Sequence, residues 1–336
     1  CTGYQAIYTA AKSVTEYLRD HKGSVNEHIF PAYVATMQKQ LENFNDVKIT
    51  PIEVPAKVFD KLLGYYVPQN LADLWQLIAQ HANSYKLING GTDLMVLANI
   101  HKKMPKHFID ISNVSELKFI RQEKNEIVIG GAVTLTEILQ SDIIKEKMPT
   151  LHYAITRMAS TQIRNVATLA GNIANASPIA DSATVLLALG AKLHLKSVAA
   201  ERFIALGECY IDYKLIQLRD DEIIYSISVP CEQGFCHFEK SAKRSVLDIA
   251  TVNSAVNVIT DENNVVTAAR IAFGGVAKYP ALACAAANYL LGKKITADVV
   301  AQLAQIARDE FSPISDIRGS ADFRQQLIYN HIIKHF

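Results

Sequence analysis

The sequence lacks the patterns that would assign a function at once. No apolar run approaches the roughly 20 residues of a membrane-spanning helix. The net charge of +1 gives no reason to propose nucleic acid or a membrane surface as a partner. No G-x-G-x-x-G, Walker A, H-E-x-x-H or G-x-S-x-G motif occurs. The sequence therefore disfavours a Rossmann dinucleotide fold and offers no P-loop, zincin or nucleophile-elbow chemistry.

Paired cysteines are also missing. The five cysteines, at positions 1, 209, 231, 236 and 284, have no spacing typical of a metal site or a disulfide framework. An odd number without such a framework favours a reducing, cytoplasmic location. The ten histidines are scattered, and we expect them at the surface or satisfied in the core rather than as metal ligands.

What is present is a chain of globular composition. Its 336 residues, 49% hydrophobic and 20% charged, suffice for two or three domains with substantial cores. Helical and strand patterns are mixed without strict alternation, which predicts an α+β fold. We expect a helical segment and linker over 1–50, a two-lobed domain over 51–230 and a small α+β domain over 231–336.

Local signals predict several individual elements. Asn70 is expected to cap a helix, and Thr134 with Glu137 forms a capping-box sequence. Alternating and continuous apolar runs predict strands, and 3.6-residue periodicity predicts helices. The predicted strands cover 85–89, 107–111, 126–130, 192–196, 222–229, 253–259 and 265–273. The predicted helices cover 6–19, 150–160, 182–189, 281–291, 296–310 and 321–335.

Two segments rich in small residues follow apolar elements and are the candidates for a binding site. In the first, Leu87 and Ile88 end a predicted strand. The turn after it and the start of the next element are Asn89, Gly90, Gly91, Thr92, Asp93 and Leu94. A strand followed by a glycine turn exposes several backbone N–H groups in one concave place, which can bind phosphate without a basic side chain.

The second segment, Thr168–Asp181, is expected to be a polar loop between apolar elements. Ala170 and Gly171 would let a flat ligand approach the backbone, and the Asn, Ser and Asp side chains supply donors and acceptors without bulk. The alternative is a turn-rich connection with self-capping Asn and Ser residues. Composition alone slightly favours that alternative.

Together, Ile88–Leu94 and Thr168–Asp181 resemble the flavin-binding signature of the molybdenum hydroxylase family. Within it, the resemblance is to the iron–sulfur/FAD subunits of bacterial xanthine dehydrogenases. Further matching stretches follow in the same order along nearly the whole chain, at 65–71, 108–112, 221–230, 238–250, 272–276 and 322–324.

The resemblance implies a fold. It is a two-lobed FAD-binding domain of the vanillyl-alcohol-oxidase/PCMH type, followed by a C-terminal domain like that of CO dehydrogenase flavoproteins. A helical remnant of a [2Fe–2S] domain would precede both. In the family, the stretch that matches Cys1–Tyr4 carries the last thiolate of that cluster. We therefore expect Cys1 as a metal ligand of an intact subunit whose missing segment supplies the other three, and no cluster on this polypeptide alone.

The resemblance also implies residue roles. Met158 lies where the family often has an aromatic residue near the cofactor, and Ile224 would pack on an FAD ring. Lys240 would place a positive charge near the polar edge of the flavin; the alternative is a solvated lysine. Ala170 replaces a glycine common in the family. The full set of implied FAD-binding residues is Leu87, Ile88, Asn89, Gly90, Gly91, Thr92, Asp93, Leu94, Met158, Thr168, Leu169, Ala170, Gly171, Asn172, Asp181, Ile224 and Lys240.

The implied function is that of an oxidoreductase subunit that passes electrons from iron–sulfur clusters to FAD and on to NAD+. Tyr213 is expected to stack on the nicotinamide, although a half-buried strand tyrosine is an equally supported interpretation. Arg244 and Asp248 would border the same pocket. The implied partner is a molybdopterin-binding large subunit in a hetero-oligomer, with xanthine as the substrate in purine metabolism. The alternatives are a related aldehyde, CO or acyl-CoA enzyme, or a non-catalytic flavin-fold scaffold.

Overall fold

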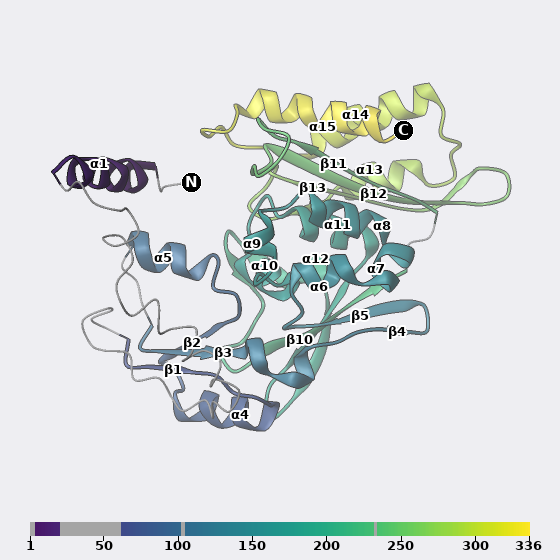
Figure 1. Ribbon diagram of the computed structural model, residues 1–336. Helices are drawn as coiled ribbons and strands as arrows, with labels where there is room; N and C mark the ends of the chain where they lie inside the picture. The colour runs from purple at the N-terminus through teal and green to yellow at the C-terminus, as the bar shows by residue number, and fades with distance from the viewer. Residues whose placement is uncertain (1–3, 21–61, 102–104, 232–233) are drawn as a thin grey trace. The chain divides into compact units, whose positions relative to one another are not determined.

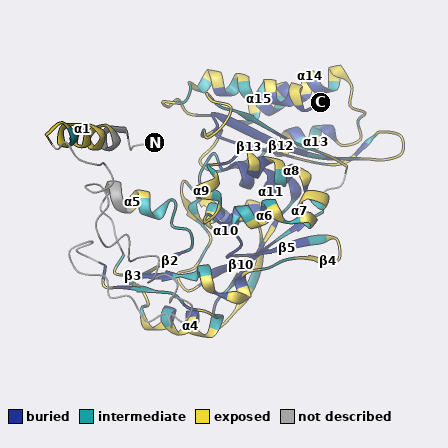
Figure 2. Cartoon of the chain, in the orientation of Figure 1, coloured by how far each residue is buried: buried dark blue, intermediate teal, exposed yellow. Residues whose placement is uncertain are grey.

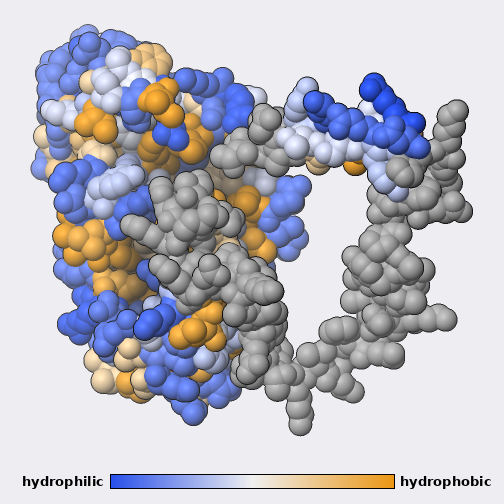
Figure 3. All heavy atoms as spheres, turned by 90° about the vertical axis from the view of Figure 1, so that its left-hand side faces the viewer, coloured by the Kyte–Doolittle hydropathy of each residue, from blue (hydrophilic) through white to orange (hydrophobic). Residues whose placement is uncertain are grey.

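The computed structural model describes residues 4–20, 62–101, 105–231 and 234–336, and the chain divides into two units, Cys1–Thr50 and Pro51–Phe336. The described element of the first unit is helix α1 (Tyr4–Asp20), which confirms the predicted helix over 6–19. Its side chains from Tyr8 onward are almost all exposed, and the face of the helix seen in Figure 3 is mostly hydrophilic. Cys1 and the predicted linker lie outside the described residues.

The second unit begins with a small lobe built on a parallel sheet in the order β1-β3-β2. Asn70 caps its first helix as predicted, because its side chain accepts a hydrogen bond from the backbone N–H of Asp73 at 2.9 Å. Leu74 and Ile78 on that helix are buried against Ile109 of the sheet. The elements are β1 (Gly64–Tyr66), α4 (Leu71–Gln80), β2 (Tyr85–Ile88), α5 (Leu94–His101) and β3 (His107–Asp110).

The larger lobe is built on a five-stranded antiparallel sheet in the order β4-β5-β10-β6-β7. Its strands are β4 (Ile120–Glu123), β5 (Glu126–Gly130), β6 (Lys192–Lys196), β7 (Glu201–Ala205) and β10 (Ile223–Pro230). Its helices are α6 (Leu135–Gln140), α7 (Asp142–Lys147), α8 (Pro149–Thr156), α9 (Thr161–Arg164), α10 (Leu169–Asn175), α11 (Asp181–Leu189) and α12 (Leu206–Cys209). The predicted capping box is present, since Thr134 and Glu137 exchange hydrogen bonds at the start of α6.

The last third of the chain forms a four-stranded antiparallel sheet with helices on one face. The strands are β11 (Phe235–Ser241), β12 (Val252–Thr260), β13 (Val266–Gly274) and β14 (Ala281–Leu282). The helices are α13 (Cys284–Leu290), α14 (Ala297–Glu310) and α15 (Ala321–His335). A short hairpin of β8 (Tyr210–Asp212) and β9 (Leu215–Ile216) precedes this region in the chain. The mixture of parallel, antiparallel and helical elements confirms the predicted α+β class.

The layers of the second unit meet at helix α11. Figure 1 shows helices between the five-stranded sheet and the four-stranded sheet, with α14 and α15 beyond the latter. All nine residues of α11 are buried, as its continuous dark colour in Figure 2 shows. The core cluster around it includes Ile227 of β10 on one side and Phe238 and Ala255 of β11 and β12 on the other. The two sheets therefore share one hydrophobic core through this helix.

Candidate functional site

The first glycine turn is shaped by backbone conformation and by close approach. β2 ends at the buried Ile88, and Gly91 turns the chain into α5 with φ of +66°, a left-handed value that favours glycine. A Cβ on Gly90 would lie only 2.0 Å from the carbonyl oxygen of Val166. Glycine is needed at both positions, at Gly91 for the turn and at Gly90 for contact with another segment.

The second segment differs from its prediction. The expected polar loop over Thr168–Asp181 contains a seven-residue helix, α10, which begins directly after Thr168, and only the stretch 176–180 is irregular. Thr168 caps this helix, since its Oγ1 accepts from the Gly171 N–H at 3.0 Å, and Ala176 ends it with φ of +46°. The prediction was wrong because Gly171, two Asn residues and Pro178 have low helix propensity and therefore indicated a loop. Thr168 was a signal for the helix, because threonine is a common N-cap residue. The backbone N–H groups offered at this position are therefore those of the first turn of α10, and not those of an irregular loop.

The structure brings the two segments together. Gly90 packs against the backbone of Val166 and Ala167, directly before Thr168. The carbonyl of Ala167 accepts a hydrogen bond from the Leu135 N–H at 2.8 Å, which holds this strip against α6. Leu87, Ile88, Thr92, Asp93 and Leu94 flank the glycine turn, and Leu169, Ala170, Gly171 and Asn172 form the first turn of α10.

A buried donor at this junction has no partner. The side-chain Nδ2 of Asn89 is buried and forms no hydrogen bond with any residue that the structure describes. Leaving such a group unsatisfied costs about 1–3 kcal/mol. The N–H group of Ala170, in the first turn of α10, has no intrahelical acceptor either. Unpaired donors beside a glycine surface free of Cβ atoms fit the diphosphate and polar edges of FAD.

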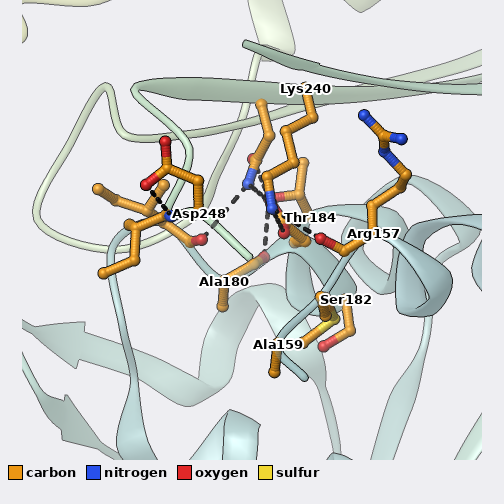
Figure 4. A network of polar contacts seen from close by, with 12 residues as sticks. Arg157, Ala159, Ala180, Ser182, Thr184, Lys240 and Asp248 are labelled. Atoms are coloured by element: carbon orange, nitrogen blue, oxygen red, sulfur yellow. Dashed lines mark hydrogen bonds and ion pairs between the residues drawn. The ribbon is translucent and has the colours of Figure 1, made fainter. Parts of the chain in front are cut away.

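A buried ion pair lies at the end of the second segment (Figure 4). Lys240 Nζ is 2.6 Å from Asp181 Oδ2, and the side chains are 8% and 7% exposed. Lys240 also donates to the carbonyl oxygen of Arg157 at 3.0 Å. Burial raises the pKa of Asp181, and this is opposed by Lys240 and by Asn253, which donates to the other carboxylate oxygen at 2.5 Å. The solvated alternative for Lys240 does not describe this structure, because its amino group is paired inside the protein.

Further polar residues extend the pair into a network. Thr184 Oγ1 donates to Asn253 Oδ1 at 2.8 Å, and Ser182 Oγ donates to Asn172 Oδ1 at 2.8 Å. The network thus joins α10 and α11 to strand β12 of the other sheet. Sequence reasoning missed Ser182, Thr184 and Asn253. A signal existed at Asn253, because Val252–Val256 is buried on both faces and a polar side chain in such a run requires a partner.

The remaining predicted residues fall into three groups. Met158 and Ile224 are 8% and 6% exposed and belong to the core cluster of the larger lobe. Tyr213 is 60% exposed in the turn between β8 and β9. Its neighbour Lys214 has its amino group 4.0 Å from Asp93, so this turn lies beside the first glycine turn. The predicted role of Cys1 concerns a residue outside the described part of the chain.

Two general features of the described residues complete the site. Within 4–20, 62–101, 105–231 and 234–336, no group of three or more His, Cys, Asp or Glu residues is arranged to hold a metal ion. None of the helices in those ranges is both long enough and apolar enough to cross a membrane.

Comparison with known proteins supplies a family context. Residues 57–232 match the model of the FAD binding domain in molybdopterin dehydrogenase, and residues 237–336 match the CO dehydrogenase flavoprotein C-terminal domain. The chain is 32% identical to a putative xanthine dehydrogenase FAD-binding subunit of Escherichia coli K12, over 79% of this chain and 91% of the relative. It is 30% identical to the carbon monoxide dehydrogenase medium chain of Hydrogenophaga pseudoflava, over 77% and 91%. In the solved carbon monoxide dehydrogenase of that organism, one chain is similar with a TM-score of 0.77 and 27% identity, over 85% of this chain and 96% of that one.

Proposed function

The chain belongs to the FAD-binding subunits of the molybdopterin dehydrogenases, a family of oxidoreductases, and from this premise we propose that it serves electron transfer from iron–sulfur clusters to NAD+ in a xanthine dehydrogenase. The unpaired Asn89 amide at the junction of two glycine-containing segments is the observation that supports a cofactor site most directly. A bound flavin would supply redox chemistry that accepts electrons one at a time and releases two of them together as a hydride.

The residues of this chain bind and orient the cofactor in this proposal. Asn89, Gly90 and the amide of Ala170 would hold the diphosphate, because these are the donors and the close backbone surface at the junction. The two binding segments would be completed by Leu87, Ile88, Gly91, Thr92, Asp93, Leu94, Thr168, Leu169, Gly171 and Asn172.

The other predicted residues would surround the ring system. Met158 and Ile224 supply apolar surface at the edge of the core. Lys240 would supply a positive charge, fixed in place by Asp181 and by the carbonyl oxygen of Arg157. Tyr213 would stack on the nicotinamide, since its exposed ring lies on a turn that reaches the first binding segment through Lys214 and Asp93.

The substrate of the whole enzyme would be bound by a molybdopterin-binding large subunit, and the [2Fe–2S] cluster by a segment to which Cys1 belongs. Xanthine is favoured by the similarity to a xanthine dehydrogenase FAD-binding subunit. The alternative is a related molybdenum enzyme, favoured by the similarity to a carbon monoxide dehydrogenase medium chain. Comparing xanthine with carbon monoxide as reductants of the assembled complex discriminates the two.

Replacing Asn89 by leucine tests the cofactor site. This change removes an unpaired buried donor at nearly constant shape, so the apo chain should keep its melting temperature or gain slightly. The dissociation constant for FAD should rise about tenfold, because a side-chain hydrogen bond to the cofactor is lost. FAD binding is measured by flavin fluorescence and stability by thermal unfolding.

The matched control for this variant is Asn288→Leu. Asn288 is an exposed asparagine on helix α13, so the same chemical change falls outside the glycine-turn junction and should leave FAD binding unaltered. An Asn89→Leu variant that loses stability yet binds FAD like the wild type would show that Asn89 has a purely internal role.

A further inference from the structure

The Lys240–Asp181 ion pair is completed by a buried asparagine from the other sheet. Asn253, on strand β12, is 0% exposed, and its Nδ2 donates to Asp181 Oδ1 at 2.5 Å. The same nitrogen lies 3.4 Å from the carbonyl oxygen of Ile179. Lys240 binds the other carboxylate oxygen, Oδ2, at 2.6 Å. Asp181 therefore has one charged donor and one neutral donor, and each serves a different oxygen.

The side chain of Thr184 fixes which end of the Asn253 amide faces Asp181. An ionised carboxylate only accepts hydrogen bonds, so the NH2 end of the amide must face Asp181 and the carbonyl end must face away. Thr184 Oγ1 meets the second requirement, because it donates to Asn253 Oδ1 at 2.8 Å and is also 0% exposed. Thr184 thus holds the donor end of Asn253 against the carboxylate.

Strand β13 leaves room for this hydrogen-bonded pair of side chains. Gly274 is the register partner of Asn253 in the sheet. A Cβ at Gly274 would lie 2.3 Å from Asn253 Oδ1 and 2.9 Å from Thr184 Oγ1. Because both side chains are buried in a close-packed interior, they have little space to move aside. A glycine at this position is therefore a steric condition for the Asn253–Thr184 hydrogen bond.

The groups around Asp181 act on its charge in opposite directions. Burial raises the pKa of Asp181, while Lys240, the Asn253 hydrogen bond and the positive charge of Arg157 lower it. From β13, the nearby cation is Arg270, which donates to the carbonyl oxygen of Leu187 in the last turn of α11, at the far end of the helix from Asp181. Asn253 differs from the cations because it favours the ionised carboxylate without adding charge. It can thus keep Asp181 ionised while the Lys240–Asp181 pair stays neutral.

We propose that Asn253 is a positioning residue for the flavin, because it keeps Asp181 ionised and so keeps the Lys240–Asp181 pair electrically neutral beside the ring system. The link to the flavin rests on the proposed function, whereas the effect on Asp181 rests on hydrogen bonds within this chain. If Asp181 took up a proton, Lys240 would retain a positive charge without compensation. A positive charge near a flavin favours the reduced, negatively charged form. Asn253 therefore limits how strongly the reduction potential of the flavin depends on pH.

The test compares the variants N253L and G274A with the control N257L. N253L removes the donor to Asp181, and G274A keeps the amide but displaces it. Asn257 is a matched control, because it lies four residues further along β12 on the same face and accepts from Cys236 Sγ at 3.4 Å.

The first measurement needs no cofactor. Proton binding by Asp181 is followed in the apo full chain by carboxyl-13C NMR of labelled aspartate, with D181N to identify the resonance. We expect Asp181 to bind its proton about tenfold more tightly in N253L and G274A than in the wild type, because a hydrogen bond to the charged form is lost. N257L should match the wild type.

The second measurement is the midpoint potential of the FAD-loaded chain against pH, by spectroelectrochemical titration. At a pH where Asp181 is protonated in N253L and ionised in the wild type, the equilibrium constant for two-electron reduction should be about tenfold larger in the variant. This change corresponds to a potential about 30 mV higher.

The possible outcomes separate the inference from the proposed function. Wild-type proton binding by Asp181 in both N253L and G274A, or an equal change in N257L, would overturn the role of Asn253. If proton binding changes in the apo chain but the midpoint potential does not follow it, Asn253 controls Asp181 and the placement of Lys240 beside the flavin is wrong. If the wild type retains no FAD, the proposed function fails, and the NMR measurement still decides whether Asn253 keeps Asp181 ionised.

Discussion

Replacing Gly90 by alanine tests whether the two binding segments must touch. The added Cβ would lie 2.0 Å from the carbonyl oxygen of Val166 and 2.9 Å from the backbone nitrogen of Ala167. Backbone atoms cannot rotate out of the way as a flexible side chain can, so the segments must separate. Overpacking of this kind costs typically about 1–3 kcal/mol.

That strain bears directly on cofactor affinity. The apo variant can relieve the clash by separating the two segments. FAD binding must then bring the segments together again, so the bound state carries the energetic cost of the clash. A penalty of about 1–3 kcal/mol then raises the dissociation constant for FAD about 5- to 150-fold. The measurement is flavin fluorescence titration of the apo variant, together with its free energy of unfolding in urea.

The control for this variant is Gly207→Ala. A Cβ at Gly207 would meet only the side chains of Leu282 and Leu187, at 3.6 and 3.7 Å, which are ordinary contact distances. G207A should therefore bind FAD like the wild type. If G90A also binds FAD with wild-type affinity and unfolds at the wild-type urea concentration, the close contact between the segments is not needed for the site.

Two further predictions concern buried charge. D181N should lower the free energy of unfolding by about 3–5 kcal/mol, because it leaves Lys240 buried without its counter-charge. The double variant D181N/K240M should lose less free energy of unfolding, as measured by urea titration. Equal losses in the two variants would contradict the pairing. His331 is buried between Ser241 and Ser254, and burial lowers its pKa from 6.5 to about 4. The unfolded chain therefore binds more protons as pH falls from 6.5 to 4, so His331 should reduce stability by about 3 kcal/mol over that window. H331Q should flatten this part of the stability profile; an unchanged slope would mean that His331 titrates alike in both states.

Local sequence signals account for much of the fold. The cap at Asn70, the capping box at Thr134 and strand β6 over 192–196 were predicted at their observed positions, because each depends on residues near in the chain. Helix α10 was missed since its weak propensity is offset by burial of Leu169 and Ile173 against the rest of the lobe. Tertiary packing of this kind overrides local preference and is not visible in a single segment.

The site was predictable in part for the same reason. The glycine turn at Gly90–Gly91 is a local signal, and the structure adds the contact with Val166 that explains it. The pairing of Asp181 with Lys240 and Asn253 joins residues 59 and 72 positions apart. Such long-range pairs depend on how the two sheets pack on α11. The resemblance to a family indicated that these positions matter, but their partners required the structure.

The two regions that match family models, 57–232 and 237–336, follow one another in the sequence but share the core around helix α11. A chain cut after residue 231 would strip one side of α11 of Phe238, Ala255 and Ala272 and leave Asp181 without Lys240. Neither half keeps this shared core when it is separated from the other. A chimera that exchanges C-terminal regions among relatives should therefore exchange the matching face of this helix as well.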